Sequence, residues 1–401
     1  MAKQNKPAIR FKGFTDAWEQ RKLGDCFTER CESMPDGELI SVTINDGIKK
    51  FSELGRHDNS NDDKSKYKKV CVGDIAYNSM RMWQGASGCS PYEGIVSPAY
   101  TVLTPNSGIN SKCMAYQFKL PATIHTFKIN SQGITSDNWN LKFPALSEIE
   151  IYVSPYEQEQ AKIAAYFANL DHLITLHQRK YDKLQVLKKA LLEKMFPKNG
   201  SSVPEIRFKG FTDAWEQRKL GEVVKEVTRN DPTSEAPIMM ITANNGFIEQ
   251  SERYAFDNAG ESLKKYILLQ KGELAYNHGA SKLRPFGSCF ALTTAESARI
   301  PFVYHCFSAE NQNAEFLSIE LNGSEVESQL RKIVSSGARM DGLLNISFDE
   351  YSTVTVLLPD IKEQEHIADF FRNLDHLITL HQRELEKLQN IKKSMLEKMF
   401  V

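Results

Sequence analysis

Two parts of this sequence occur twice without a change. Residues 9–24 return as residues 206–221, and residues 169–179 return as residues 373–383. The stretches between these identical blocks have diverged strongly. An internal repeat of this kind indicates two structural units with a common scaffold, each of about 200 residues. We expect the identical segments to form a common scaffold. The two variable segments between them would then recognise two different targets.

The bulk composition excludes several classes of protein. A chain of 401 residues is too long for one core and suits about two to four domains. The formal net charge is −1, so nucleic-acid binding would have to come from local patches or from a partner. No apolar run approaches the roughly 18 residues of a membrane span, and the N-terminus lacks an apolar signal-peptide core. Seven cysteines without a CxxC pair are typical of reduced thiols, so we expect a cytoplasmic protein with no metal site and no membrane partner.

Two long helices are predicted, one from about Glu157 to Phe196 and one from residue 362 to the chain end. Their apolar residues alternate at spacings of three and four, which is the heptad seam of a coiled coil. Polar residues interrupt both seams at His177, Lys188, His381 and Lys392. These residues either fix register and partner or extend out of a loosely packed seam. The residues predicted for helix–helix packing are Ile163, Phe167, Leu170, Ile174 and Leu184 in the first helix and Ile367, Phe371, Leu374, Ile378 and Leu388 in the second.

The two helices most economically pack on each other. Residues 197–202 contain proline, glycine and serine, which end the first helix and form a flexible link. Antiparallel packing would place the two globular parts at opposite ends of a rod, whereas parallel packing would place them at the same end. We favour the antiparallel arrangement.

The globular parts are predicted to be mixed, with strands predominating. Residues 38–44 form a strand that runs into an Asn-Asp-Gly turn, and residues 238–243 form its counterpart before Asn-Asn-Gly. Residues 70–78 and 269–277 each place a glycine and an acid in a turn before a buried strand. The fold class expected is α+β, with two mixed α/β domains and a pseudo-two-fold internal repeat.

The sequence contains no recognisable catalytic set. It has no GxxxxGK[ST] phosphate loop, so ATP hydrolysis by this chain is not expected. It has no Asn-Pro-Pro-aromatic tetrapeptide of the kind that amino-methyltransferases use. His172 and His177 are five residues apart and would point about 140° away from each other on a helix, which disfavours a shared metal.

Three pairs of motifs carry a resemblance to a known family. Each half opens with Arg-Phe-x-Gly-Phe…Trp…Lys-Leu-Gly, continues with Gly-Asp/Glu-x-Ala-Tyr-Asn, and enters its helix with Glu-Gln…Ile-Ala…Phe…Leu-Asp…Ile. These motifs lie at residues 10–24, 73–78 and 159–174, and again at 207–221, 272–277 and 363–378. In this respect the whole chain resembles the specificity subunits of type I restriction–modification systems. The resemblance implies a first target recognition domain at 1–156, a conserved helix at 157–197, a second recognition domain at 198–361 and a second conserved helix at 362–401.

The resemblance also implies a mechanism. Each recognition domain would read part of a bipartite, asymmetric site in double-stranded DNA, and the helices would set the length of the unread spacer. Two methyltransferase subunits would dock on the scaffold, flip an adenine out of the duplex and methylate its N6 atom. Two restriction/translocase subunits would join for cleavage. No cofactor is expected in this chain, because S-adenosylmethionine, ATP and Mg²⁺ would be bound by the partner subunits.

Base contacts are expected from the variable middles rather than from the frames. Arginine can read guanine and glutamine can read adenine, each through two hydrogen bonds in the major groove, while lysine suits phosphates. The alternative for each residue is that it is a solvent-exposed loop residue that binds no ligand. Trp83 could equally be a packing residue. Trp18 and Trp215 lie in the identical frames and are interpreted as scaffold. The predicted DNA-binding residues are Asn45, Asn78, Arg81, Trp83, Gln84, Asn244, Asn245, Asn277, Lys282, Arg284 and Arg339.

Two other functions remain open at this point. One is a coiled-coil scaffold for proteins without a role in DNA binding, which the duplicated helices permit. The other is a self-contained DNA methyltransferase, against which the missing motifs argue.

Overall fold

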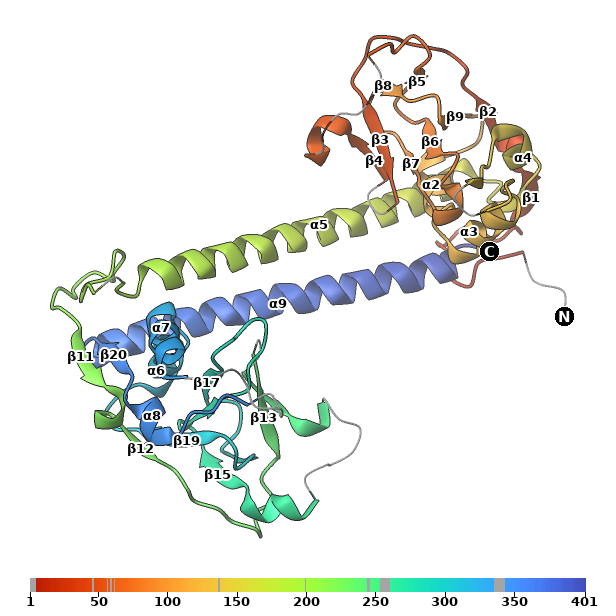
Figure 1. Cartoon of the computed structure of the whole chain (residues 1–401). Coiled ribbons are helices and arrows are strands. Elements are labelled where there is room, and N and C mark those ends of the chain that lie inside the picture. Colours follow the sequence, from red (N-terminus) through yellow and green to blue (C-terminus); the bar gives the residue numbers. More distant parts are fainter. Residues whose placement is uncertain are drawn as a thin grey trace. The chain divides into compact units, whose positions relative to one another are not determined.

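The chain forms two compact units (Figure 1). The computed structural model describes residues 5–44, 47–55, 57, 60, 62–135, 138–198, 200–243, 246–252, 260–334 and 343–401. Unit 1 consists of Met1–Arg179 and Gln382–Val401, and unit 2 of Lys180–His381. Each unit therefore contains one globular part and one end of each long helix. The four segments expected from the sequence divide the chain differently, because they assign each long helix to a segment of its own.

Unit 1 is built on a four-stranded antiparallel sheet with the order β2-β9-β6-β7, beside three two-stranded pairs, β1-β10, β3-β4 and β5-β8. Its strands are β1 (Glu19–Lys22), β2 (Phe27–Glu29), β3 (Ile40–Thr43), β4 (Gly47–Lys50), β5 (Lys68–Val70), β6 (Ile75–Asn78), β7 (Ser87–Cys89), β8 (Gly94–Val96), β9 (Tyr100–Pro105) and β10 (Glu150–Val153). Its helices are α1 (Leu23–Cys26), α2 (Ser111–Gln117), α3 (Pro121–Ile129), α4 (Phe143–Ser147) and the first part of α5 (Glu157–Lys194).

Unit 2 repeats this topology, with a four-stranded sheet in the order β12-β19-β16-β17 and the pairs β11-β20, β13-β14 and β15-β18. Its strands are β11 (Glu216–Lys219), β12 (Val224–Glu226), β13 (Met239–Thr242), β14 (Gly246–Glu249), β15 (Ile267–Gln270), β16 (Leu274–Asn277), β17 (Ser288–Ala291), β18 (Ser297–Ile300), β19 (His305–Ala309) and β20 (Thr355–Leu358). Its helices are α6 (Ala314–Leu321), α7 (Ser324–Ile333), α8 (Phe348–Ser352) and the first part of α9 (Ile361–Met399). The predicted α+β class with an internal repeat is confirmed.

The turn before the central strand has the same construction in both units. Gly73 has φ +92° and Gly272 has φ +85°, a backbone region that favours glycine. In unit 1 the carboxylate of Asp74 accepts a hydrogen bond from the Cys71 amide at 2.8 Å. In unit 2 the carboxylate of Glu273 accepts one from the Gln270 amide at 2.6 Å. The glycine and the acid therefore close the turn, as the sequence predicts.

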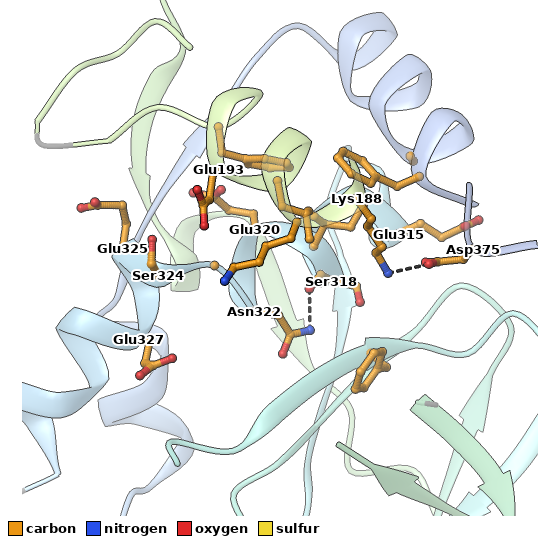
Figure 2. A pocket seen from close by; sticks show the side chains of 18 of the residues that line it. Lys188, Glu193, Glu315, Ser318, Glu320, Asn322, Ser324, Glu325, Glu327 and Asp375 are labelled. Carbon is orange, nitrogen blue, oxygen red and sulfur yellow. Dashed lines mark hydrogen bonds and ion pairs between the residues drawn. The ribbon is translucent and has the colours of Figure 1, made fainter. Parts of the chain in front are cut away.

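Within each unit the two helix ends run antiparallel. In unit 1, Asp171 pairs with Lys392 at 2.5 Å, and Phe167, one turn earlier in α5, contacts Phe400, which lies later in the chain. In unit 2, Lys188 of α5 pairs with Asp375 of α9 at 2.5 Å (Figure 2). Lys188 and Lys392, the two lysines that interrupt the heptad seams, thus each form an ion pair with an aspartate of the other helix.

The predicted seam residues lie mostly in the unit cores. Ile163, Phe167 and Leu170 are buried in a cluster that includes Leu388 and the C-terminal residues of α9. Ile367, Phe371, Leu374 and Ile378 are buried in the core of unit 2, against which Leu184 packs. Ile174 is half-buried. This packing fixes each globular part against the helices.

Candidate nucleic-acid interface

The repeated frames are anchored on the helices by a buried ion pair. In unit 1 the guanidinium of Arg10 donates to both carboxylate oxygens of Glu159, at 2.5 and 2.8 Å. The Trp18 ring and the Ser154 hydroxyl donate to the same carboxylate, at 3.3 and 2.5 Å. The hydrogen bond that Arg10 donates to Glu159 raises the pKa of Arg10. Trp18 is 3% exposed, in agreement with its interpretation as scaffold.

Unit 2 repeats the ion pair but not the whole network. Arg207 donates twice to Glu363, each time at 2.7 Å. The position of Ser154 is taken by Pro359, since both residues accept a hydrogen bond from the first-turn glutamine of the adjoining helix at 2.9 Å. The Nε1 atom of Trp215 and the Nη1 atom of Arg207 are buried without a hydrogen-bond partner among the described residues, whereas in unit 1 the equivalent atoms donate to Glu159 and to the Asp16 carbonyl.

The loop after β6 presents the first group of predicted DNA-binding residues. Asn78 ends the strand, and its side chain accepts a hydrogen bond from the Met80 amide at 3.1 Å, which shapes the bend. Arg81 is exposed and donates to Gln84 at 3.3 Å. The half-buried Trp83 ring donates to the Met80 carbonyl at 3.0 Å and packs edge-on against Trp139, with ring centroids 5.2 Å apart. The loop therefore exposes Arg81, which is bonded to the half-buried Gln84, while Trp83 holds the loop in place.

The loop after β16 holds the counterparts in unit 2. Asn277 accepts from the Gly279 amide at 2.9 Å and donates to the Ile241 carbonyl at 3.1 Å, so it also shapes its loop. Lys282 is exposed. Arg284 is half-buried, donates to the Asn322 carbonyl at 2.8 Å, and has its pKa lowered by burial. Its guanidinium is thus turned toward α6, and only Lys282 of this loop extends a charge into solvent. A contact of any of these side chains with DNA stays a prediction.

The remaining predicted residues, Asn45, Asn244, Asn245 and Arg339, lie outside the described residues. The strands that flank the two asparagine turns are described. In unit 1, the Lys119 ammonium donates to the carbonyls of Ile44 and Gly85, at 2.8 and 2.5 Å. In unit 2, Asn277 makes the comparable link to Ile241, at the β13 end of the other hairpin. The structure therefore brings the end of the first hairpin strand and the loop after the central strand together in each unit, as one surface.

Sequence reasoning missed two residues that build this surface in unit 1. Lys119 joins the two segments, and Trp139 supports Trp83 and lies under the Lys128 ammonium, which is 5.5 Å from the Trp139 ring centroid. Both come from segments that are distant in sequence from the loop, and no motif marks them. Only the packing of the segments after α2 and α3 beside this loop brings them to this place.

Neither a cluster of metal-ligand side chains nor a membrane-spanning helix is found in the described part of the chain. No three or more His, Cys, Asp and Glu side chains there are placed to hold a metal ion. No helix among the described residues is long and apolar enough to cross a membrane.

Comparisons with known proteins agree on one family. A family model described as "Type I restriction modification DNA specificity domain" matches residues 15–186. The type I restriction enzyme MjaVIII specificity subunit of Methanocaldococcus jannaschii is 23% identical over 362 residues, which cover 83% of this chain and 81% of that protein. The crystal structure of a type I restriction–modification S subunit from M. genitalium has the same fold, with a TM-score of 0.57 and 13% identity over 99% of both chains.

The matched region contains the loop after β6, Trp18 and Glu159 of the unit 1 frame, and most of α5, whereas Arg10 lies before it. The same frame and topology recur in unit 2. Residues 15–186 therefore match the family of type I restriction modification DNA specificity domains, and because the same frame recurs in residues 206–383, the chain is similar over its whole length to type I specificity subunits.

Proposed function

We propose that this specificity subunit reads a bipartite, asymmetric target in double-stranded DNA, one half with each unit, across a spacer that it does not read. The observation that carries the proposal is the contrast within each unit. The frames and their ion pairs are repeated, whereas the loops after β6 and β16 differ in sequence and in the charges that they expose. Two copies of one scaffold that expose different loops suit the reading of two different half-sites.

The two loops suggest different modes of reading. Arg81 and Gln84 carry the donor patterns that suit guanine and adenine edges in the major groove. The corresponding loop of unit 2 exposes Lys282, which suits a phosphate, so base contacts there would come from other residues of the same surface. The asparagines at positions 45, 244 and 245 remain candidates for that role.

The long helices would act as the ruler for the spacer. Each is continuous, from Glu157 to Lys194 and from Ile361 to Met399, and each contributes to both units. An α-helix is stiff and rises about 1.5 Å per residue, so its length would set the number of base pairs between the half-sites.

The chemistry would be supplied by partners. We propose that two methyltransferase subunits dock on the repeated scaffold and transfer a methyl group from S-adenosylmethionine to the N6 atom of a flipped adenine. Two restriction/translocase subunits with ATP and Mg²⁺ would add cleavage in the cytoplasm. This chain contributes recognition and no catalytic residue to that complex.

The test is a map of DNA methylation. The chain is expressed with the methyltransferase encoded beside it in a host that lacks adenine methylation, and N6-methyladenine is located by long-read sequencing. We expect one bipartite motif that is absent when this chain is omitted. Folded, associated proteins that methylate nothing would refute recognition and favour the protein-scaffold alternative.

A variant of one loop sharpens the test. Replacing residues 78–85 by the loop of another specificity subunit should change one half of the motif and leave the other half and the spacer intact. A change in both halves would contradict the assignment of one half-site to each unit.

A further inference from the structure

A buried histidine ring stands at the start of the loop after β16. His278 is 7% exposed and directly follows the last residue of that strand. Its Nδ1 atom lies 2.8 Å from the Leu344 carbonyl oxygen, and its Nε2 atom lies 2.6 Å from the Val303 carbonyl oxygen. The ring therefore bridges two segments that are distant from it in sequence.

The chemistry of these two contacts requires a charged ring. A carbonyl oxygen can only accept a hydrogen bond, so each ring nitrogen that contacts one must carry a hydrogen. A neutral imidazole carries a hydrogen on one nitrogen only, and its other nitrogen would turn a lone pair toward a carbonyl oxygen. Both contacts are favourable only in the imidazolium, which has two N–H donors, and hydrogen bonds from a charged donor are stronger than neutral ones.

A second histidine lies against this ring and leaves the charge on His278. The centroids of the stacked His305 and His278 rings are 5.0 Å apart, and the His305 Nε2 atom contacts the Ile346 carbonyl at 3.0 Å. Burial lowers the pKa of His305, and the charge of His278 lowers it further. His305 therefore stays neutral and donates from Nε2, because two stacked cations would repel each other.

The other titratable side chains against the two rings are tyrosines. The ring centroid of Tyr276 in β16 lies 6.3 Å from that of His278 and 6.1 Å from that of His305. Tyr351 of α8 lies 6.5 Å from His305 by the same measure. No acidic or basic side chain within the described ranges forms a hydrogen bond or an ion pair with either ring. The two carbonyl oxygens are thus what holds the proton on His278.

The repeat places two hydroxyl groups where unit 2 has the two imidazoles. The position after the Ala-Tyr-Asn motif holds Ser79 in unit 1 and His278 in unit 2. The strand position opposite the tyrosine of that motif holds Thr101 in unit 1 and His305 in unit 2. The hydroxyl oxygens of Ser79 and Thr101 share a hydrogen bond at 2.8 Å. This pair carries no charge, so it does not change with pH in the neutral range.

The backbone link at this place is the same in both units. The Leu141 amide donates to the Ser79 carbonyl at 2.9 Å, and the Leu344 amide donates to the His278 carbonyl at 2.9 Å. In unit 2 the Leu344 carbonyl also accepts from the His278 ring. The imidazolium therefore adds a second bond between Leu344 and the start of the loop after β16.

We propose that the His278 imidazolium positions the loop after β16 for DNA recognition, so that recognition by unit 2 weakens as the pH rises and recognition by unit 1 does not. The inference rests on the proposed function, in which this loop belongs to the surface that reads one half-site. His278 is a positioning residue, since it acts through the loop that exposes Lys282. Histidine side chains titrate between about pH 5 and pH 8. Both ring contacts are made while the ring is protonated, and loss of the proton at higher pH replaces one of them by repulsion between lone pairs.

The charge is measured on the full chain without DNA. Histidines are isotope-labelled, and their ring nitrogen shifts are followed by NMR spectroscopy from about pH 5.5 to about pH 8. The signals of His278 are those that disappear in His278→Gln. We expect two similar nitrogen shifts for His278 at pH 6, the signature of an imidazolium, and two widely separated shifts at pH 8. A neutral His278 ring over the whole range would overturn the proposal.

Recognition is measured with the chain in complex with its methyltransferase. One DNA duplex carries the bipartite motif from the methylation map, and each of two others has one half-site scrambled. The half-site of unit 1 is the one that changes when residues 78–85 are replaced. The ratio of the affinities for the motif and for a scrambled duplex, at constant salt, gives the discrimination at each half-site. Between pH 6 and pH 8 it should fall about tenfold for unit 2, which corresponds to one charged hydrogen bond, and stay within about twofold for unit 1.

Two variants separate the charge of His278 from its packing. His278→Gln keeps a polar side chain that cannot become charged, so it should show the weaker discrimination at both pH values. The double variant of His278→Ser with His305→Thr installs the pair that unit 1 contains. It should make discrimination by unit 2 independent of pH, and it also serves if His278→Gln does not fold. The control His172→Gln removes an exposed histidine of α5 and should leave the pH profile unchanged.

The outcomes distinguish this inference from the proposed function. A complex that binds the motif no better than either scrambled duplex, at either pH, contradicts the proposed function and this inference together. Motif binding with the same pH profile for both half-sites contradicts the role of His278 alone. A pH profile of unit 2 that persists in the folded double variant would place the titrating group elsewhere and would likewise refute that role.

Discussion

Replacing Glu320 by glutamine should stabilise unit 2 in a manner that depends on pH. Burial raises the pKa of Glu320 to about 7 from its ordinary value of 4.5, and the Leu357 amide offsets only part of this effect. The acid is therefore protonated in the folded unit over a range of pH in which it is ionised in the unfolded chain. Below about pH 4.5 the two states hold the same proton and Glu320 carries no penalty.

The sign and the size follow from this difference in pKa. Between about pH 4.5 and pH 7 the folded state binds more protons than the unfolded state, so the free energy of unfolding falls as the pH rises. A difference of one pKa unit corresponds to about 1.4 kcal/mol, so the loss approaches about 3 kcal/mol at pH 8 and is about 1 kcal/mol at pH 5. The glutamine side chain of the variant cannot ionise, and its amide oxygen can still accept from the Leu357 amide.

The assay is equilibrium unfolding in urea at pH 5 and at pH 8 for both chains. The stability difference in favour of Glu320→Gln should grow by about 2 kcal/mol between the two pH values. The matched control is Gln117→Glu in unit 1, where the new acid would be equally buried and the chain should lose stability as the pH rises. A pH-independent effect of Glu320→Gln would refute the reasoning, because it would mean that Glu320 titrates alike in the folded and unfolded states.

Three further results are expected. Glu159→Ala leaves Arg10 buried without its partner and should destabilise the chain by about 3–5 kcal/mol in urea unfolding. Lys271→Ala removes the exposed ion pair of Lys271 with Glu296 and should cost less than about 1 kcal/mol. Equal effects of the two variants would contradict the anchoring role of the pair of Arg10 and Glu159. Insertion of four residues into both long helices lengthens each helix by about 6 Å. The spacer in the methylation motif should then grow by about two base pairs, with both half-sites intact. An unchanged spacer would show that the helices do not set its length. Arg81→Ala should weaken binding to the specific DNA by about 1–3 kcal/mol and relax one half-site only, measured by fluorescence anisotropy at fixed salt; equal weakening on unrelated DNA would make Arg81 a phosphate contact.

The sequence predicts the large features of this fold because they depend on local and periodic signals. The repeat indicates two units, and the heptads predict two helices whose observed limits, Glu157–Lys194 and Ile361–Met399, lie close to the expected ones. The turn with Gly73 and Asp74 is predicted for the same reason, since the positive φ and the side-chain cap involve neighbours in sequence. Lys188 and Lys392 each form an ion pair with an aspartate of the other helix, while a role of the polar seam residues in fixing register stays a prediction.

The features that the sequence does not predict depend on contacts between distant segments. Arg284 was expected to face DNA, and nothing near it in sequence indicates that it bonds to the Asn322 carbonyl. Lys119 joins the end of the hairpin strand to the loop after β6 only once the segment that follows α2 lies beside both.

The different hydrogen bonding around the two frame tryptophans affects which part of the protein unfolds first. Identical frame sequences are held by unequal networks, since two buried donors that are paired in unit 1 have unpaired equivalents in the described part of unit 2. Each unpaired donor lowers the resistance to local opening by about 1–3 kcal/mol. The two frames therefore have the same sequence but different resistance to local unfolding. Under heat or tension, we expect the frame of the second half to detach from its helix first.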